Sequence, residues 1–230
     1  MLPQYEHFEE IEVQVASVDG LLRDGQERFL FETVKRLPQD ATIVEIGAFM
    51  GKSTLCMGFA CLGTRRKIYS VDTWNGNNAD FFINDFYINW ATNVINAGLE
   101  GHAFPLVGNS RVIMPLWETI SKGKKIDMLL IDGSHVYNDV LADFYNSFNH
   151  VKDNGLVFLH DITDDGWQGP DRVWKELASN LLVDQVFLST LGGGRKNANL
   201  PRWAEMYCNK ILNSHKSVPE RSFPAEVRPM

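Results

Sequence analysis

Short apolar runs alternate along the chain with segments in which apolar residues recur at helical spacing. The apolar runs are nearly continuous, which is typical of strands covered on both faces of a parallel sheet. The pattern predicts an α/β fold with a seven-stranded, mostly parallel sheet and helices on both of its faces. The expected strands are Thr42–Ile46, Lys67–Val71, Ala103–Val107, Ile126–Ile131, Leu156–His160, Val183–Ser189 and Arg202–Cys208.

Helices are expected before the first strand and in the connections between strands. The clearest pattern lies in Val136–His150, where the apolar residues form one stripe along the helix. Pro38 ends the first expected helix, because proline cannot continue a helix. The expected helices are Arg23–Arg36, Ser53–Leu62, Asn84–Ala97, Arg111–Ser121, Val136–His150 and Asp171–Leu182.

Composition divides the chain into three regions, and the net charge disfavours one class of partner, nucleic acid. Residues 1–22 are acidic and weakly patterned, which indicates an N-terminal arm or cap, and residues 23–212 carry the α/β pattern. Residues 213–230 are polar and contain proline, which is typical of a loosely held tail. The net charge of −7 argues against broad binding to nucleic acid.

The chain also lacks the signals of export and of membrane insertion. No apolar run approaches the length of a membrane span, and the acidic N-terminus has no apolar segment typical of a signal peptide. The three cysteines are an odd set without Cys-x-x-Cys spacing, which is typical of reduced thiols. We therefore expect a cytoplasmic protein without a membrane partner, and the sequence gives no oligomeric state.

The segment Ile43–Thr54, IVEIGAFMGKST, has the pattern of a buried strand, an acid, a glycine turn and the start of a helix. Only three residues separate Gly47 from Gly51, whereas a P-loop needs four, so a P-loop NTPase is disfavoured. The dinucleotide fingerprint would put its middle glycine at Phe49, and Glu45 precedes the glycines, which disfavours an NAD-dependent oxidoreductase. What fits is an acid two residues before a Gly-x-x-x-Gly turn.

Carboxylates recur where the predicted strands end, at Glu45, Asp72, Asp132 and Asp161. Ligands of open α/β sheets lie outside the carboxyl ends of the strands, so these acids are expected at one cleft. Each alone could be a helix cap or a solvated turn residue, but their recurrence favours a site. Asp72 suits the two hydroxyls of a ribose, and the start of the helix at Ser53 suits a carboxylate of the ligand.

Further polar residues follow the later strands. Asn109 and Ser110 could place an amide against an adenine edge or form a plain turn with a helix cap. His135 follows Asp132 by three residues, and its unperturbed pKa near neutrality suits a general base. The alternative for His135 is a capping role before the next helix.

The acid and Gly-x-x-x-Gly turn at Glu45–Gly51 resemble motif I of the class I S-adenosylmethionine-dependent methyltransferases. Four segments, VEIGAFMGKST, SVDTW, IDMLLIDGSHVYNDVLADF and NGLVFLHD, narrow this resemblance. Together they resemble the O-methyltransferase group that includes macrocin O-methyltransferase and cephalosporin-hydroxylase-like proteins, and the resemblance runs from about Gln26 to Lys175. It implies the Rossmann-like class I methyltransferase fold over residues 23–212, with an antiparallel last strand. It also implies an enzyme that methylates an oxygen of a small hydroxylated metabolite, whose identity the sequence does not give.

The resemblance implies roles for individual residues. The methionine part of the cofactor would lie against the glycine turn, its ribose at Asp72 and its adenine near Asn109 and Ser110. The residues expected at S-adenosylmethionine are Glu45, Gly47, Gly51, Ser53, Asp72, Asn109, Ser110 and Asp132. Those expected at the methyl acceptor are Asp132, His135 and Asp161.

Several relatives bind Mg²⁺ through acids that map onto Asp132, His160 and Asp161. His160 departs from that pattern, because Mg²⁺ prefers oxygen ligands and imidazole suits softer metals. A bound metal or His135 would then handle the proton of the acceptor. A non-catalytic S-adenosylmethionine- or nucleotide-binding module remains the alternative, and it would have no use for Asp132, His135 and Asp161.

Overall fold

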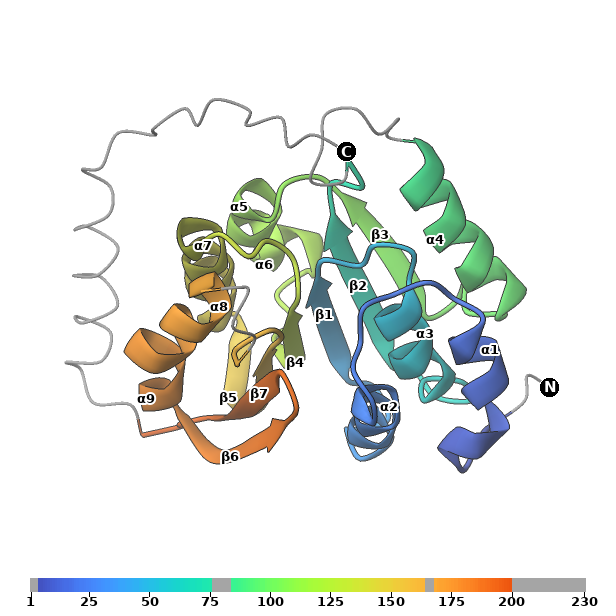
Figure 1. Cartoon of the computed structure of the whole chain (residues 1–230), viewed down its shortest axis with the longest axis horizontal. Helices are drawn as coiled ribbons and strands as arrows, with labels where there is room; N and C mark the ends of the chain where they lie inside the picture. The colour runs from blue at the N-terminus through green and yellow to red at the C-terminus, as the bar shows by residue number, and fades with distance from the viewer. Residues whose placement is uncertain (1–3, 76–83, 164–167, 200–230) are drawn as a thin grey trace, which may run out of the picture. The chain divides into compact units, whose positions relative to one another are not determined.

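A computed structural model describes residues 4–75, 84–163 and 168–199 of the chain (Figure 1). Its seven strands form one sheet in the order β3-β2-β1-β4-β5-β7-β6. The first five strands in this order are parallel, whereas β7 runs antiparallel to both of its neighbours. The strands are β1 (Thr42–Ile46), β2 (Lys67–Asp72), β3 (Ala103–Val107), β4 (Ile126–Ile131), β5 (Val151–Leu159), β6 (Leu182–Leu188) and β7 (Leu191–Lys196).

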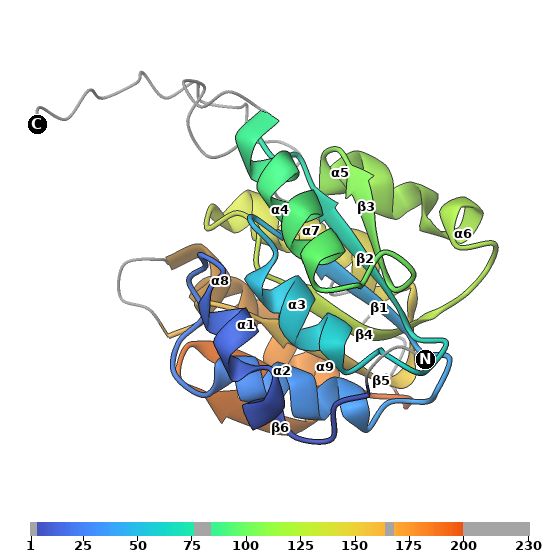
Figure 2. The ribbon, with the colours of Figure 1, turned by 90° about the vertical axis from the view of Figure 1, so that its right-hand side faces the viewer.

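Helices cover both faces of the sheet, so the predicted architecture is confirmed (Figures 1 and 2). The helices of one face are α1 (Glu12–Ala16), α2 (Gln26–Lys35), α3 (Lys52–Phe59) and α4 (Asn84–Asn96), preceded by a short 3₁₀ turn, η1 (Phe8–Glu10). Those of the other are α5 (Ser110–Ile113), η2 (Met114–Leu116), α6 (Trp117–Ile120), α7 (Tyr137–Phe148), α8 (Gln168–Val173), η3 (Trp174–Ala178) and α9 (Ser179–Leu181).

The seventh strand lies earlier than predicted. It is Leu191–Lys196, whereas the range Arg202–Cys208 and the tail 213–230 lie outside the described residues. The run of glycines in β7 hid the strand, because glycine is depleted in strands. Here the missing side chain is required, since a Cβ atom on Gly193 would lie 2.1 Å from Cδ1 of Phe158 in the neighbouring strand β5.

Two predicted helices are broken in the structure. The range Arg111–Ser121 is divided into α5, η2 and α6, because Pro115 has no N–H group to continue the helical hydrogen bonds. The range Asp171–Leu182 contains a π-helical segment, η3, between α8 and α9. The helical spacing of apolar residues continues through both ranges, so the sequence pattern does not indicate where either helix is interrupted.

The N-terminal segment packs into the main core. Phe8, Ile11, Val15 and Val18 are buried in one cluster with residues of α2 and α3. The side chains of this segment therefore help to hold the helices that flank β1. No helix in the described parts of the chain combines the length and the apolar character of a membrane span.

Candidate functional site

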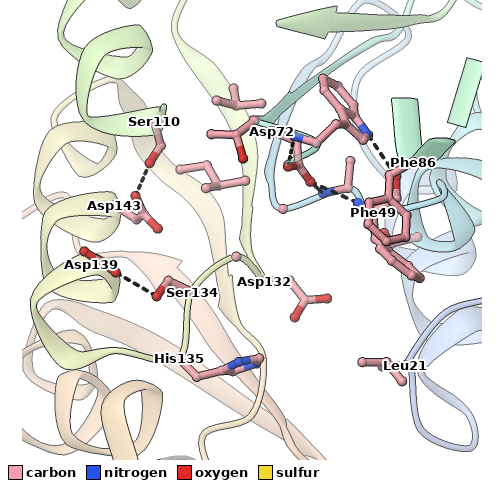
Figure 3. A pocket seen from close by; sticks show the side chains of 18 of the residues that line it. Leu21, Phe49, Asp72, Phe86, Ser110, Asp132, Ser134, His135, Asp139 and Asp143 are labelled. Atoms are coloured by element: carbon pink, nitrogen blue, oxygen red, sulfur yellow. Dashed lines mark hydrogen bonds between the residues drawn. The ribbon is translucent and has the colours of Figure 1, made fainter. Parts of the chain in front are cut away.

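A cavity of about 520 Å³ lies at the carboxyl ends of the parallel strands (Figure 3). Its polar wall carries Ser110, Ser134, Asp139 and Asp143, and the opposite wall carries Leu21, Phe49 and Phe86. The volume is in the range of small-molecule and cofactor sites. The predicted site residues that line it are Gly47, Ser53, Asp72, Asn109, Ser110, Asp132, His135 and Asp161, whereas Glu45, Gly51 and His160 do not.

The turn after β1 forms the centre of the cavity wall. Gly47 has a φ of +87° and Gly51, at the start of α3, has a φ of +95°. A Cβ atom on Gly47 would lie 2.1 Å from the carbonyl oxygen of Asp132, so this turn and the turn after β4 are in direct contact. Gly47 therefore lines the cavity with backbone alone, and Gly51 allows the left-handed turn that begins α3 behind it.

The carboxylate of Asp72 ties this turn to the end of β2. Oδ2 accepts hydrogen bonds from the backbone N–H groups of Ala48 at 2.7 Å and Phe49 at 3.0 Å. Oδ1 accepts from the N–H of Trp74 at 2.7 Å. Asp72 therefore lines the cavity and also holds its wall in place.

Glu45 lies behind the cavity wall. Its side chain is fully buried, and its two oxygens accept hydrogen bonds from the hydroxyls of Ser53, Thr54 and Ser70. Burial raises the pKa of Glu45 to about 7, although these three hydrogen bonds oppose the shift. In place of the predicted contact with a cofactor, Glu45 links β1 to α3 and β2.

The far end of the cavity is built by the start of α5 and by α7. Asn109 is the N-cap of α5, where its Oδ1 accepts from the N–H of Arg111 at 2.9 Å, as in the turn alternative of the sequence analysis. The hydroxyl of Ser110 donates to Asp143. Burial raises the pKa of Asp143 to about 7, while the bond from Ser110 opposes the shift.

Asp143 was missed by the sequence analysis. The available signal was its position on α7, between Leu141 and Phe144 on the apolar stripe, where a charged residue has no place in a plain core. A buried carboxyl on that stripe indicates a polar feature facing the helix. Here that feature is the cavity and Ser110.

Two histidines contact Asp161 at the ends of β4 and β5. Nε2 of His135 lies 2.8 Å from Oδ2 of Asp161, and Nδ1 of His160 lies 3.1 Å from Oδ1. Nδ1 of His160 also lies 3.1 Å from Oδ1 of Asp132. The structure thus brings together the four ionisable residues that were predicted at the acceptor and metal sites.

The charges in this cluster stabilise one another. Burial alone would raise the pKa of Asp161, but hydrogen bonds with His135 and then His160 outweigh it and hold this pKa well below its usual range. Burial alone would lower the pKa of His160, but its contacts with Asp132 and Asp161 outweigh it and raise this pKa to about 10. No described residue gives Nδ1 of His160 an aligned hydrogen bond, so its contacts with the two carboxylates are ionic in geometry.

Three residues around the cavity that are not glycine have a left-handed backbone. The φ angles are +46° for Phe49, +50° for Trp74 and +56° for Asp161. Such conformations cost about 1–2 kcal/mol each for residues with a side chain. They are over-represented at functional sites, where the surrounding structure holds them.

A family model described as a methyltransferase domain matches residues 44–162, more than half of the chain. An uncharacterized protein of Sinorhizobium fredii, y4gI, is 29% identical over 145 residues, which cover 60% of this chain. The chain spans only 15% of the length of that relative.

Solved structures of methyltransferases have a similar fold. An O-methyltransferase from Bacillus cereus in complex with SAH is 18% identical with a TM-score of 0.61, over 85% of this chain and 93% of that one. MycE, a methyltransferase from the mycinamycin biosynthetic pathway in complex with Mg, SAH and mycinamycin VI, is 16% identical with a TM-score of 0.56. The latter match covers 87% of this chain and 58% of that one. At such identities the likeness is one of fold, and it confirms the predicted Rossmann-like methyltransferase architecture.

Proposed function

The chain belongs to the methyltransferase-domain family, and on this premise we propose that it is an S-adenosylmethionine-dependent O-methyltransferase of a small hydroxylated molecule. The observation that carries the proposal is the position of His135. Its ring lines the same cavity as the glycine turn and Asp72, and its Nε2 contacts Asp161. A proton acceptor beside a cofactor-sized cavity suits transfer of a methyl group to a hydroxyl oxygen.

The cofactor is proposed to lie along the turn after β1. The first turn of α3, at Ser53, has a partial positive charge that suits the carboxylate of the methionine part. Asp72 accepts three backbone hydrogen bonds, and a carboxylate can accept about four, so it retains capacity for a ribose hydroxyl. Asn109 and Ser110 border the end of the cavity where the adenine would lie.

The reaction requires alignment of two atoms and removal of one proton. As the acceptor oxygen forms its bond to the methyl carbon, the carbon–sulfur bond breaks and its electron pair stays on sulfur, which yields S-adenosylhomocysteine. The hydroxyl proton passes to His135. A neutral His135 that donates its Nε2–H to Asp161 keeps Nδ1 as the proton acceptor, and Asp161 then stabilises the imidazolium that forms.

A divalent metal ion is the second way to handle this proton. The donor set of Asp132, His160 and Asp161 suits such an ion, since one potential ligand atom from each lies within 4.8 Å of the others. Nδ1 of His160 is buried between the two carboxylates with no aligned hydrogen bond to a described residue, and a bound ion would take the place of its proton there. When bound, the ion would lower the pKa of an acceptor hydroxyl. Mg in the MycE complex supports this version.

A cytoplasmic location is also proposed. Cys56 and Cys61 are buried free thiols, as is usual where thiols remain reduced. Burial raises the pKa of Cys61 to about 12, which makes it an inert thiol rather than a redox centre.

A ligand panel followed by a transfer assay tests the proposed function. We expect S-adenosylmethionine and S-adenosylhomocysteine to raise the melting temperature, and NAD and ATP to leave it unchanged. Transfer of a labelled methyl group is then screened over sugars, catechol-like diols and other hydroxylated metabolites. Cofactor binding without transfer to any acceptor would favour the binding module, and stabilisation by NAD alone would favour an oxidoreductase.

A further inference from the structure

Gln26, the first residue of α2, is fully buried and contacts the ring of His160 from a position 134 residues earlier in the chain. Its Oε1 lies 2.8 Å from Nε2 of His160. Neither the cofactor cavity nor the proposed proton transfer accounts for this buried amide. Its contact therefore raises the question of what it does to the histidine.

The backbone determines which way the amide of Gln26 points. The N–H of Arg23, which can only donate, lies 2.7 Å from Oε1. The carbonyl of Leu188, which can only accept, lies 3.1 Å from Nε2 of Gln26. Exchange of the amide oxygen and nitrogen would break both bonds, so Oε1 is an acceptor on the side of His160.

It follows that Nε2 of His160 carries a proton. An acceptor at 2.8 Å requires a donor, and the ring nitrogen is the only group of that pair that can supply it. In the neutral ring the lone pair then belongs to Nδ1. This is the atom that lies 3.1 Å from both Asp132 and Asp161.

The surroundings of Nδ1 suit a cation. The side chain of His160 is only 2% exposed, and Nδ1 has no aligned hydrogen bond with any described residue. Adjacent ligands of an octahedral ion lie about 3 Å apart when each bond is about 2.1 Å, which agrees with the observed 3.1 Å separations. In the metal-free protein the two carboxylates favour a second ring proton on Nδ1, and a bound metal ion would replace that proton as the positive charge between them.

We propose that Gln26 is a positioning residue that presents Nδ1 of His160 as a metal ligand, and that this nitrogen makes the site prefer Mn²⁺ to Mg²⁺. The inference rests on the metal-assisted version of the proposed function. The donor set mixes two carboxylates with one imidazole. Mg²⁺ prefers oxygen throughout, whereas Mn²⁺ shares that preference for carboxylates but, as a divalent transition metal, binds a nitrogen ligand more readily than Mg²⁺ does. Partners that orient a histidine ligand typically change metal affinity 10–100-fold when they are removed.

The test is a titration of the cofactor-free, full-length protein with Mn²⁺, followed by electron paramagnetic resonance, with Mg²⁺ as competitor. Gln26→Met keeps the length of the side chain and removes the strong acceptor, so we expect Mn²⁺ binding at least 10-fold weaker. Gln26→Glu keeps an acceptor for Nε2–H, so we expect affinity within about threefold of wild type, since carboxylate–histidine–metal arrangements are common. Thr33→Ala, at another buried site on α2, is the matched control and should bind as wild type does.

The electron spin echo spectrum of bound Mn²⁺ should also contain nitrogen coupling from an imidazole, and His160→Asp should remove it and shift the preference toward Mg²⁺. If Gln26→Met does not fold, Gln26→Ala is held to the same tenfold threshold. Wild-type affinity in the variant without an acceptor, or equal losses in Gln26→Met and Gln26→Glu, would overturn the role of Gln26. A wild-type protein that binds no Mn²⁺ would overturn the inference but leave methyl transfer through His135 intact, whereas Mn²⁺ binding without methyl transfer would overturn only the proposed function.

Discussion

Gly47 lies so close to Asp132 that a Cβ atom on the glycine would stand 2.1 Å from the Asp132 carbonyl oxygen. The N–H of Asp132 in turn donates to the carbonyl of Ile46 at 2.8 Å, so a hydrogen bond also joins the ends of β1 and β4 beside this contact. The glycine turn therefore couples the proposed cofactor site to the first acid of the proposed acceptor site. A small change in either turn is transmitted to the other, because packed backbone has little room to yield.

Gly47→Ala should damage both stability and cofactor binding. The φ of +87° costs a side chain about 1–2 kcal/mol, and the contact with Asp132 adds a steric cost. Gly98→Ala is the matched control, since Gly98 has a φ of +68° but no atom within 4 Å of its Cβ position. Chemical denaturation should show the larger loss for Gly47→Ala, and calorimetry should show at least tenfold weaker binding of S-adenosylhomocysteine for this variant alone. Equal effects of the two substitutions would mean that the close contact is relieved without cost.

Glu45→Gln should alter how stability depends on pH. The pKa of Glu45 is raised from 4.5 to about 7 in the folded protein, so the folded state holds this proton more tightly than the unfolded state. The stabilisation from protonated Glu45 is therefore complete below pH 4.5 and is lost as the pH rises through about 7. Across this window the wild type should lose on the order of 3 kcal/mol relative to Glu45→Gln, which has no such proton to lose.

Denaturant titrations of both proteins at several pH values measure this difference. The exposed Glu118→Gln variant controls for the change in net charge. A stability difference between wild type and Glu45→Gln that does not change with pH would mean that Glu45 stays ionised in the folded protein.

The sequence analysis anticipated the parallel part of the sheet well, because buried parallel strands are almost uniformly apolar and each ends in a turn or an acid. It failed at β7, where three consecutive glycines remove the side-chain pattern on which the prediction depends. The room that these glycines leave for Phe158 comes from tertiary packing and has no local signature.

The sequence predicted most of the strand-end residues that line the cavity, but it missed Asp143 and gave no indication of how these residues contact one another. Asp132, His135 and Asp161 do line one cavity, as the strand-end rule suggests. Whether a strand-end acid faces the ligand or the core is decided by the opposite helix, which is why Glu45 bonds to Ser53 and Thr54. The contact between Gln26 and His160 joins α2 to the end of β5, and no local pattern could indicate it.

Asp72→Ala should weaken binding of the cofactor. The substitution removes a charge-assisted acceptor for a ribose hydroxyl and also releases the N–H groups of Ala48 and Phe49. The expected loss is about 1.5–3 kcal/mol. Asp72→Asn keeps one oxygen for the turn and should lose less. Calorimetry with S-adenosylhomocysteine measures both variants, and equal affinity in wild type and Asp72→Ala would remove Asp72 from the site.

Proton transfer to His135 and proton transfer assisted by a metal ion predict opposite responses of turnover to chelation. If His135 is the base, turnover should survive EDTA and should fall at least ~100-fold in His135→Ala, the usual scale for a general base. If a metal handles the proton, EDTA should abolish turnover and Mn²⁺ or Mg²⁺ should restore it. His102→Ala is the control, because His102 contacts the carbonyl of Arg66 at 3.0 Å and does not line the cavity.

Asp161 makes the two versions separable, since it contacts His135 through Oδ2 and His160 through Oδ1. Asp161→Asn should leave cofactor affinity unchanged in either version, because the proposed cofactor contacts lie at Gly47, Ser53 and Asp72. If His135 is the base, the variant should have a lower kcat, because Asp161 no longer stabilises the imidazolium. Added metal should then not change kcat. If a metal handles the proton, excess Mn²⁺ should recover part of kcat, because the substitution weakens one metal ligand and a higher metal concentration compensates for the weaker binding. Unchanged kcat in Asp161→Asn would contradict both versions, and it would leave Asp161 as a structural partner of the two histidines.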